Sequence, residues 1–307
     1  MKVLVTGGKG VVGTKLAQKL KDMGHEVWVC DLKHSYEVHY FRCDVGKFRQ
    51  LENIFKQQTF DYVYHLAAEF GRWNGEDYYE DLWLTNAVGT KNILRLQQEY
   101  GFKLVFTSSS EVYGDYDGVM VEDVMEKLEI KQMNDYAITK WVNEMQILNE
   151  AAMHGNQVVR VRIFNTYGPG EYYTPYRSAI CTFAYKALHN LPYTIYLGHK
   201  RNALYIDDCA SALANITMNF KPGEVYNVAG IEMHDMKTVS DQILKFLGKD
   251  DSQVIYKEEE MFTTRIKQPD ITKARRDLNY EPQTFLAEGI PKTLEWMKEV
   301  YGLKQVE

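Results

Sequence analysis

The sequence predicts an α/β fold built on a doubly wound parallel sheet, because short apolar runs alternate with longer helical patterns through its first half. A glycine-rich loop follows the first apolar run, and the regular alternation stops near residue 166. The apolar runs that we expect to form strands are 2–6, 27–30, 62–66, 103–107 and 158–162. Together these observations predict a Rossmann-type sheet followed by a smaller mixed α/β lobe.

The first helix follows from the spacing of its apolar residues. Within residues 11–23, Val12, Leu16 and Leu20 fall on one stripe, as expected of a helix that packs on a sheet. Gly24 ends the pattern, because glycine is favoured just beyond the last helical turn.

A break in the architecture is expected at 165–170, where two glycines and a proline follow the last strand of the sheet. We therefore expect a Rossmann domain over 1–166, to which 202–229 return, and a smaller second lobe over 167–307. Within the second lobe the patterns predict a helix at 177–190, a strand at 193–197 and a closing helix at 287–301.

Composition narrows the classes of function. The 36 basic and 42 acidic side chains form no long run of one sign, so a nucleic-acid-binding face is not expected. No apolar stretch approaches the roughly 20 residues of a membrane helix. The N-terminal residues enter a strand directly, without a basic leader, which predicts a cytoplasmic protein. The four cysteines show no CxxC spacing, so we expect neither disulfides nor a metal site.

Gly7, Gly10 and Gly13 lie between the first strand and the first helix, the context in which glycines bind a dinucleotide. Glycines let the backbone approach a pyrophosphate, which then lies at the positive end of the helix that Val11 and Val12 begin. The spacing is GxxGxxG rather than GxGxxG, and a purely structural turn remains the alternative.

Asp31 ends the second strand, about 20 residues after the glycines, where a carboxylate accepts hydrogen bonds from the adenosine ribose. A carboxylate there repels a 2′-phosphate, so the predicted cofactor is NAD rather than NADP. Asp44 and Val45 are candidates for the adenine contact, although Asp44 can equally well serve a turn or a helix cap. The residues after the fourth strand that we expect to lie against the cofactor are Leu66, Ala67 and Ala68.

Tyr136 and Lys140 are four residues apart, so a helix presents them on one face. A free phenol has a pKa of about 10, and a nearby ammonium favours its ionised form. Tyr136 can then accept the proton of a hydroxyl group while hydride leaves the same carbon for NAD. The pattern alone is common, and a chance occurrence remains the alternative.

Ser109 and Glu111 follow the fifth strand, at the carboxyl edge of the sheet where doubly wound folds bind ligands. Ser109 can hydrogen-bond the hydroxyl that is oxidised, and Glu111 can act as a general acid or base. A serine-rich strand exit that caps a helix is the alternative.

The chain resembles the extended short-chain dehydrogenases/reductases, in the family of sugar-nucleotide epimerases and dehydratases, over nearly its whole length. The motifs that carry the resemblance are TGGKGVVG, Asp31, HLAA, NAVGT, TSSSEVYG, YAITK, RIFNTYGP, YIDD and PDITKA. The resemblance implies an NAD-dependent enzyme that acts on a nucleotide-diphosphate sugar, with Ser109, Tyr136 and Lys140 as its catalytic triad.

The resemblance also implies roles outside the triad. Arg201 would contact the phosphates or the sugar of the substrate, and Asn165 would lie at the mouth of the sugar-diphosphate site. The helices at 86–98 and 135–152 would pair with a second subunit in a homodimer.

The family's shared first step is oxidation at C4 of the sugar, and Glu111 argues for chemistry beyond simple epimerisation. We expect a 4,6-dehydratase, in which Glu111 removes the C5 proton, although many such enzymes carry aspartate where this chain has Ser110. The Ser-Ser-Glu order resembles the Thr-Ser-Glu of GDP-mannose 4,6-dehydratases and of UDP-glucuronate decarboxylases. The decarboxylases are the first alternative, followed by 4-epimerases and 4-dehydrogenases. A catalytically silent NAD-binding scaffold is disfavoured, because Tyr136 and Lys140 are both present.

Two segments depart from the family pattern. Residues 69–79 contain Arg72 and several aromatic residues that can line a substrate pocket or simply pack. Residues 172–177 contain three tyrosines and Arg177, which is a candidate to contact the substrate nucleotide, with packing as the alternative.

Overall fold

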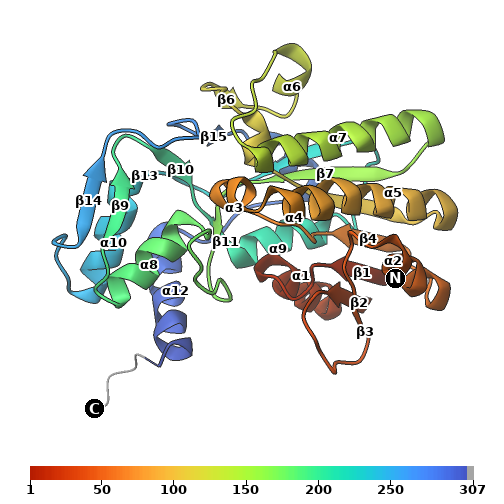
Figure 1. The fold of residues 1–307 in the computed structure, drawn as a ribbon, viewed down its shortest axis with the longest axis horizontal. Coiled ribbons are helices and arrows are strands. Elements are labelled where there is room, and N and C mark those ends of the chain that lie inside the picture. The colour runs from red at the N-terminus through yellow and green to blue at the C-terminus, as the bar shows by residue number, and fades with distance from the viewer. Residues whose placement is uncertain (303–307) are drawn as a thin grey trace.

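A computed structural model, which describes residues 1–302, has a seven-stranded parallel sheet at its centre (Figure 1). The strand order is β12-β7-β5-β4-β1-β2-β3, so the chain winds outward from β1 in both directions. The strands are β1 (Lys2–Thr6), β2 (Glu26–Asp31), β3 (Tyr40–Arg42), β4 (Tyr62–His65), β5 (Lys103–Ser109), β7 (Val158–Ile163) and β12 (Val225–Val228). The predicted fold class is confirmed.

Helices cover both faces of the sheet, because successive strand side chains point to opposite sides. Val3 and Val5 of β1 share a buried cluster with Leu16 of α1, whereas Leu4 packs in a second cluster with Ile54 of α2. The helices of the two layers are α1 (Val11–Asp22) and α9 (Ile206–Asn215) on one face, and α2 (Phe48–Gln57), α5 (Gly89–Tyr100) and α7 (Asp135–His154) on the other.

The smaller lobe has its own apolar core, which includes Phe183, Ile195, Ile243 and Leu294. Figure 1 shows its helices grouped to one side of the large sheet, away from β1, β2 and β3. Its elements are α8 (Ala179–Leu188), β9 (Tyr193–Tyr196), β10 (Lys200–Asn202), β13 (Met233–Asp235), α10 (Met236–Leu247), β14 (Val254–Lys257) and α12 (Leu286–Val300).

Short elements connect the domain of the large sheet to the smaller lobe. Two-stranded pairs join β6 (Val119–Met120) to β15 (Gln268–Pro269), and β8 (Thr166–Tyr167) to β11 (Leu204–Tyr205). The remaining helices are α3 (Arg72–Asp77), α4 (Tyr79–Trp83), α6 (Val124–Lys127) and α11 (Thr272–Leu278), with a π-helical turn at Leu84–Val88 and a 3-10 turn at Ser110–Tyr113. The segment 258–266, between β14 and β15, is called the strap below.

The predicted elements are present with small shifts at their ends. The first helix ends at Asp22, one residue earlier than expected. The helix expected from 177 begins at Ala179, because Ser178 caps it by accepting a hydrogen bond from the Cys181 amide at 3.2 Å.

The segment 202–229 returns to the sheet. It supplies β12, which pairs with β7, and α9, whose Leu213 shares the buried cluster of α1. Of the predicted second lobe, residues 303–307 lie outside the described residues. Across residues 1–302, we find no helix with both the length and the apolar character needed to span a bilayer.

Candidate active site

A cavity of about 700 Å³ opens at the carboxyl ends of β1, β2, β4, β5 and β7. Parallel strands end at one edge of a sheet, so residues far apart in the sequence meet there. The cavity is lined by every candidate residue that the sequence suggested: Gly7, Gly10, Val11, Val12, Gly13, Asp31, Asp44, Val45, Leu66, Ala67, Ala68, Ser109, Ser110, Glu111, Tyr136, Lys140, Asn165, Arg177 and Arg201.

The glycine loop forms a cradle that side chains would fill. Gly7 has a φ of +66°, and a Cβ atom on Gly13 would lie 2.3 Å from the Gly7 carbonyl oxygen. Gly10 precedes α1 and has no side chain to cap the helix, so the first amides of α1 are open to an anion. This cradle fits a dinucleotide pyrophosphate.

Asp31 is fixed in position by backbone amides. Its two carboxylate oxygens accept hydrogen bonds from the Lys9 amide at 2.9 Å and the Lys33 amide at 3.2 Å. A negative charge held at this place fits NAD and disfavours a 2′-phosphate.

Asp44 lines the same cavity, but its carboxylate accepts a hydrogen bond from the Gly46 amide at 2.9 Å. This hydrogen bond corresponds to the turn role, one of the roles that the sequence left open for Asp44.

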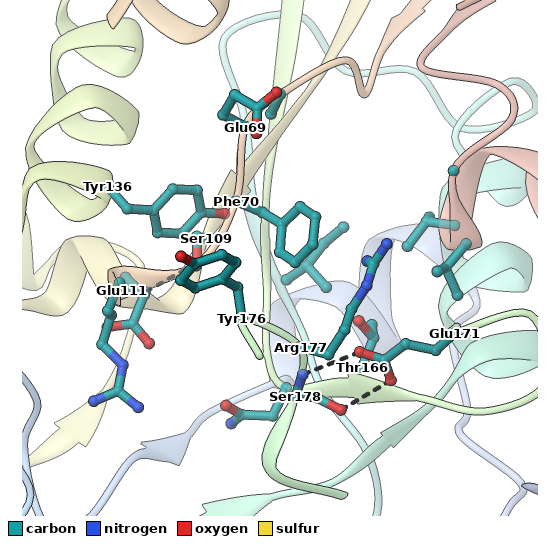
Figure 2. A pocket seen from close by; sticks show the side chains of 18 of the residues that line it. Glu69, Phe70, Ser109, Glu111, Tyr136, Thr166, Glu171, Tyr176, Arg177 and Ser178 are labelled. Carbon is teal, nitrogen blue, oxygen red and sulfur yellow. Dashed lines mark hydrogen bonds between the residues drawn. The ribbon is translucent and has the colours of Figure 1, made fainter. Parts of the chain in front are cut away.

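Tyr136 and Lys140 both project from α7 into the cavity, as their spacing predicts. The helix is fixed at its start by Asn134, whose side chain accepts a hydrogen bond from the Ala137 amide at 2.8 Å. Figure 2 shows the Tyr136 hydroxyl directed towards Ser109, the last residue of β5.

The electrostatics of this pair differ from the sequence-based expectation. Burial raises the pKa of Tyr136 to about 12, although the neighbouring Ser109 hydroxyl acts in the opposite direction. Lys140 lies 5.9 Å from the centre of the Tyr136 ring and donates to the Thr107 carbonyl oxygen at 2.9 Å. Burial also lowers the pKa of Lys140 to about 8. The protein alone therefore holds Tyr136 as a neutral phenol.

Glu111 is held by an ion pair that the sequence did not indicate. Its carboxylate is bonded to Lys267, the residue that follows the strap. Burial acts to raise the pKa of Glu111, but the positive charges of Lys267, Arg72 and Arg201 lower it to about 2. Burial lowers the pKa of Lys267 to about 8, and the two arginines add to this effect. The pKa values of an acid and of its basic partner both fall, as expected in a region with surplus positive charge.

Ser110 lines the cavity beside Glu111. Its hydroxyl group is a much weaker acid than a carboxyl group, so it is poorly suited to general acid catalysis.

Arg201 is nearly saturated by protein partners. Its guanidinium donates to the carbonyl oxygens of Lys200 at 2.9 Å and Arg265 at 2.8 Å, and to the Thr263 hydroxyl at 3.2 Å. Two of these partners belong to the strap, so Arg201 anchors the strap as well as lining the cavity.

The aromatic segment at 172–177 divides between packing and the cavity. Tyr172 contacts Trp296 of α12, and Tyr173 stacks on Tyr185 of α8, so these two rings pack within the smaller lobe. Tyr176 and Arg177 line the cavity, as Figure 2 shows.

The guanidinium of Arg177 lies 4.2 Å from the centre of the Phe70 ring. Its Nε atom is buried without a hydrogen-bond partner. Asn165 faces the same cavity and donates to the Asn202 carbonyl oxygen at 3.3 Å.

Residues 3–229 match the family described as "NAD dependent epimerase/dehydratase family". The chain belongs to this family. It is therefore an NAD-dependent enzyme of the extended short-chain dehydrogenase/reductase type, and the predicted resemblance is confirmed.

Known members of the family show how widely its reactions vary. This chain is 27% identical to the UDP-N-acetyl-alpha-D-glucosaminuronate decarboxylase of Bacillus cytotoxicus, over 97% of this chain and 98% of that one. It is 26% identical to the dTDP-glucose 4,6-dehydratase of Salmonella typhimurium, over 96% and 92% of the two chains. A solved structure, the UDP-glucuronic acid 4-epimerase of Bacillus cereus with UDP-glucuronic acid and NAD, has a TM-score of 0.86 and 25% identity, covering 98% of this chain and 100% of that one.

Within the described residues, no group of three or more histidine, cysteine, aspartate or glutamate side chains is arranged to hold a metal ion.

Proposed function

We propose that this family member removes the carboxyl group of a nucleotide-linked uronic acid. The observation that carries the proposal is the surplus of positive charge around Glu111. Within residues 1–302, Arg72, Arg201 and Lys267 face two carboxylates, those of Glu111 and Glu260. A buried surplus charge is costly unless an anion compensates it. The carboxylate of a uronic acid would supply that anion.

The residues at the other end of the cavity support the initial oxidation. Tyr136 would take the proton of the C4 hydroxyl, and Ser109, towards which the Tyr136 hydroxyl points, would orient the C4 hydroxyl. NAD, held by the glycine cradle and Asp31, supplies a reversible hydride acceptor when bound. Its positive charge would also favour the Tyr136 phenolate that the protein alone does not stabilise.

A C4 ketone makes the uronic acid a β-keto acid. The bond between C5 and the carboxyl carbon then breaks, carbon dioxide leaves, and the electron pair forms an enolate with the C4 ketone. C5 takes a proton from solvent, and return of the hydride restores the C4 hydroxyl. This sequence requires no base at C5 and no acid for a leaving hydroxyl.

The same features disfavour the dehydration that the sequence analysis put first. Dehydration needs a base to remove the C5 proton, and a carboxylate with a pKa of about 2 is a weak base. It also needs an acid for the departing C6 hydroxyl, and the Ser110 hydroxyl is a poor one.

The proposal is tested by mass spectrometry of products. Purified protein with NAD is incubated separately with UDP-glucuronate, UDP-N-acetylglucosaminuronate, UDP-glucose, GDP-mannose and dTDP-glucose. We expect loss of carbon dioxide from one of the two uronic acids and no net NADH. Loss of water from a neutral sugar, or a C4 epimer of unchanged mass as the sole product, would overturn the proposal.

The homodimer stays a prediction. Val88, Met145 and Leu148 lie on or next to the two helices that the family resemblance assigns to a subunit interface, and each is 45% exposed. Such exposed apolar side chains are compatible with a covered surface.

A further inference from the structure

The strap is fastened to the loop that follows β4. Arg72, in that loop, donates to the Met261 carbonyl oxygen at 3.2 Å and to the Glu260 carboxylate at 2.7 Å. The neighbouring Trp73 ring contacts Phe262 edge to face, with ring centres 5.2 Å apart. These contacts join a loop of the large sheet to a segment of the smaller lobe, directly beside the cavity.

Arg72 is placed there by a glycine that the backbone requires. Gly71 has a φ of +96°, which ordinary residues rarely adopt, and a Cβ atom on it would lie 3.0 Å from the Tyr176 carbonyl oxygen. Arg72 is the first residue of α3, so this turn directs its side chain towards Glu260 and the sugar end of the cavity.

Glu260 is shared between three groups. One carboxylate oxygen faces Arg72 at 2.7 Å, and the other faces Arg201 and His199, each at 3.7 Å. The side chains of Arg72 and Glu260 are 22% and 18% exposed, so a ligand in the cavity can reach both. Arg201 donates to two carbonyl oxygens, whereas the shortest contact of Arg72 is with a carboxylate that also faces Arg201.

We infer that Arg72 is the residue that distinguishes an acidic sugar from a neutral one, and that Glu260 occupies its guanidinium until the carboxylate of the sugar replaces it. The inference rests on the proposed function, because it assigns the recognition of the carboxylate that is lost. When the sugar binds, Arg72 exchanges one carboxylate for another and stays paired. Glu260 keeps Arg201 and His199.

A neutral sugar cannot make this exchange, because it has no carboxylate. Its hydroxyl cannot replace the ionic contact between Arg72 and Glu260, because a neutral hydroxyl lacks the attraction between opposite charges that a carboxylate has for the guanidinium. Specificity is a difference in binding free energy between two ligands. Here that difference comes from how an acidic and a neutral sugar interact with the Arg72 guanidinium.

The test compares binding of UDP-glucuronate and UDP-glucose to the NAD-loaded protein by isothermal titration calorimetry. The variants are Arg72→Gln and Glu260→Gln. The matched control is Arg265→Gln, because Arg265 lies in the same strap, is exposed and donates only to the Glu258 carbonyl oxygen among the contacts that the structure gives. Thermal unfolding midpoints and NAD content establish that each variant is folded.

Wild-type protein and Arg265→Gln are expected to prefer UDP-glucuronate. Arg72→Gln should reduce that preference by about tenfold or more, the effect expected for one lost charged hydrogen bond. Glu260→Gln should strengthen the preference, because the competing carboxylate is gone. Retained preference in Arg72→Gln, or weaker UDP-glucuronate binding in Glu260→Gln, would overturn the inference.

Product analysis separates this inference from the proposed function. If wild-type protein binds UDP-glucuronate selectively through Arg72 but releases no carbon dioxide, the proposed reaction fails and the role of Arg72 stands. If carbon dioxide is released and Arg72→Gln keeps its preference, the role of Arg72 fails and the reaction stands.

Discussion

Replacing Glu111 by glutamine should destabilise the folded protein at neutral pH by about 3 kcal/mol. The pKa of Glu111 falls from 4.5 to about 2 on folding, because the cations around it outweigh the effect of burial. At about 1.4 kcal/mol for each pH unit, this fall corresponds to roughly 3 kcal/mol of stability. The side chain is only 17% exposed, so solvent screens the interaction little.

The sign of the pH dependence follows from the direction in which folding shifts the pKa of Glu111. The folded pKa is lower than the unfolded one, so the stabilisation is fully present above pH 4.5 and is lost as the pH falls towards 2. The contribution of Glu111 to the difference in unfolding free energy between wild type and Glu111→Gln should therefore shrink as the pH falls below about 4.5.

A compensating substitution makes the test specific. Glu111→Gln leaves Lys267 buried without its carboxylate, and breaking one side of a buried pair is far more costly than replacing both partners. The double variant Glu111→Gln/Lys267→Met should therefore recover most of the lost stability. Urea unfolding followed by tryptophan fluorescence measures all three proteins. A double variant as unstable as Glu111→Gln, or a single variant as stable as wild type, would refute the reasoning.

Two further predictions concern the cofactor cradle and the buried charges beneath the site. Gly13→Ala should yield protein without bound NAD, because the new Cβ would lie 2.3 Å from the Gly7 carbonyl oxygen and the loop must shift; chromatography of released nucleotide checks this, and normal NAD content would contradict it. Glu144→Gln should cost about 3–5 kcal/mol in unfolding free energy, because Glu144 is fully buried against two arginines. The control Glu52→Gln breaks an exposed pair and should cost less than about 0.5 kcal/mol.

The sequence was sufficient to predict the fold class and the cofactor end of the site. Gly7, Gly13 and Asp31 are recognisable because they lie at fixed distances from strand ends, and parallel strands carry their ends to one edge. Tyr136 and Lys140 share a helix face because four residues make about one turn. These relations are local in the chain, so they can be read without knowing how distant segments pack.

The partners of Glu111 could not be found in this way. Lys267 is 156 positions away and follows a strap with no periodic pattern. Nothing in the sequence around this buried lysine distinguishes it from the lysines on the surface. The difference between Arg72 and Arg201 was equally hidden, because it depends on tertiary contacts: Arg201 donates to the carbonyl oxygens of Lys200 and Arg265, whereas Arg72 pairs with the Glu260 carboxylate.

The sequence by itself thus determined the sheet, the NAD cradle, the Tyr136–Lys140 pair and the position of Glu111 beside them. Only the tertiary structure decided the pKa of that carboxylate and the electrostatics of the sugar end. The physical reason is that a pKa depends on burial and on charges within a few ångströms. Those charges come from Arg72, Arg201 and Lys267, which the fold brings together from three separate parts of the chain.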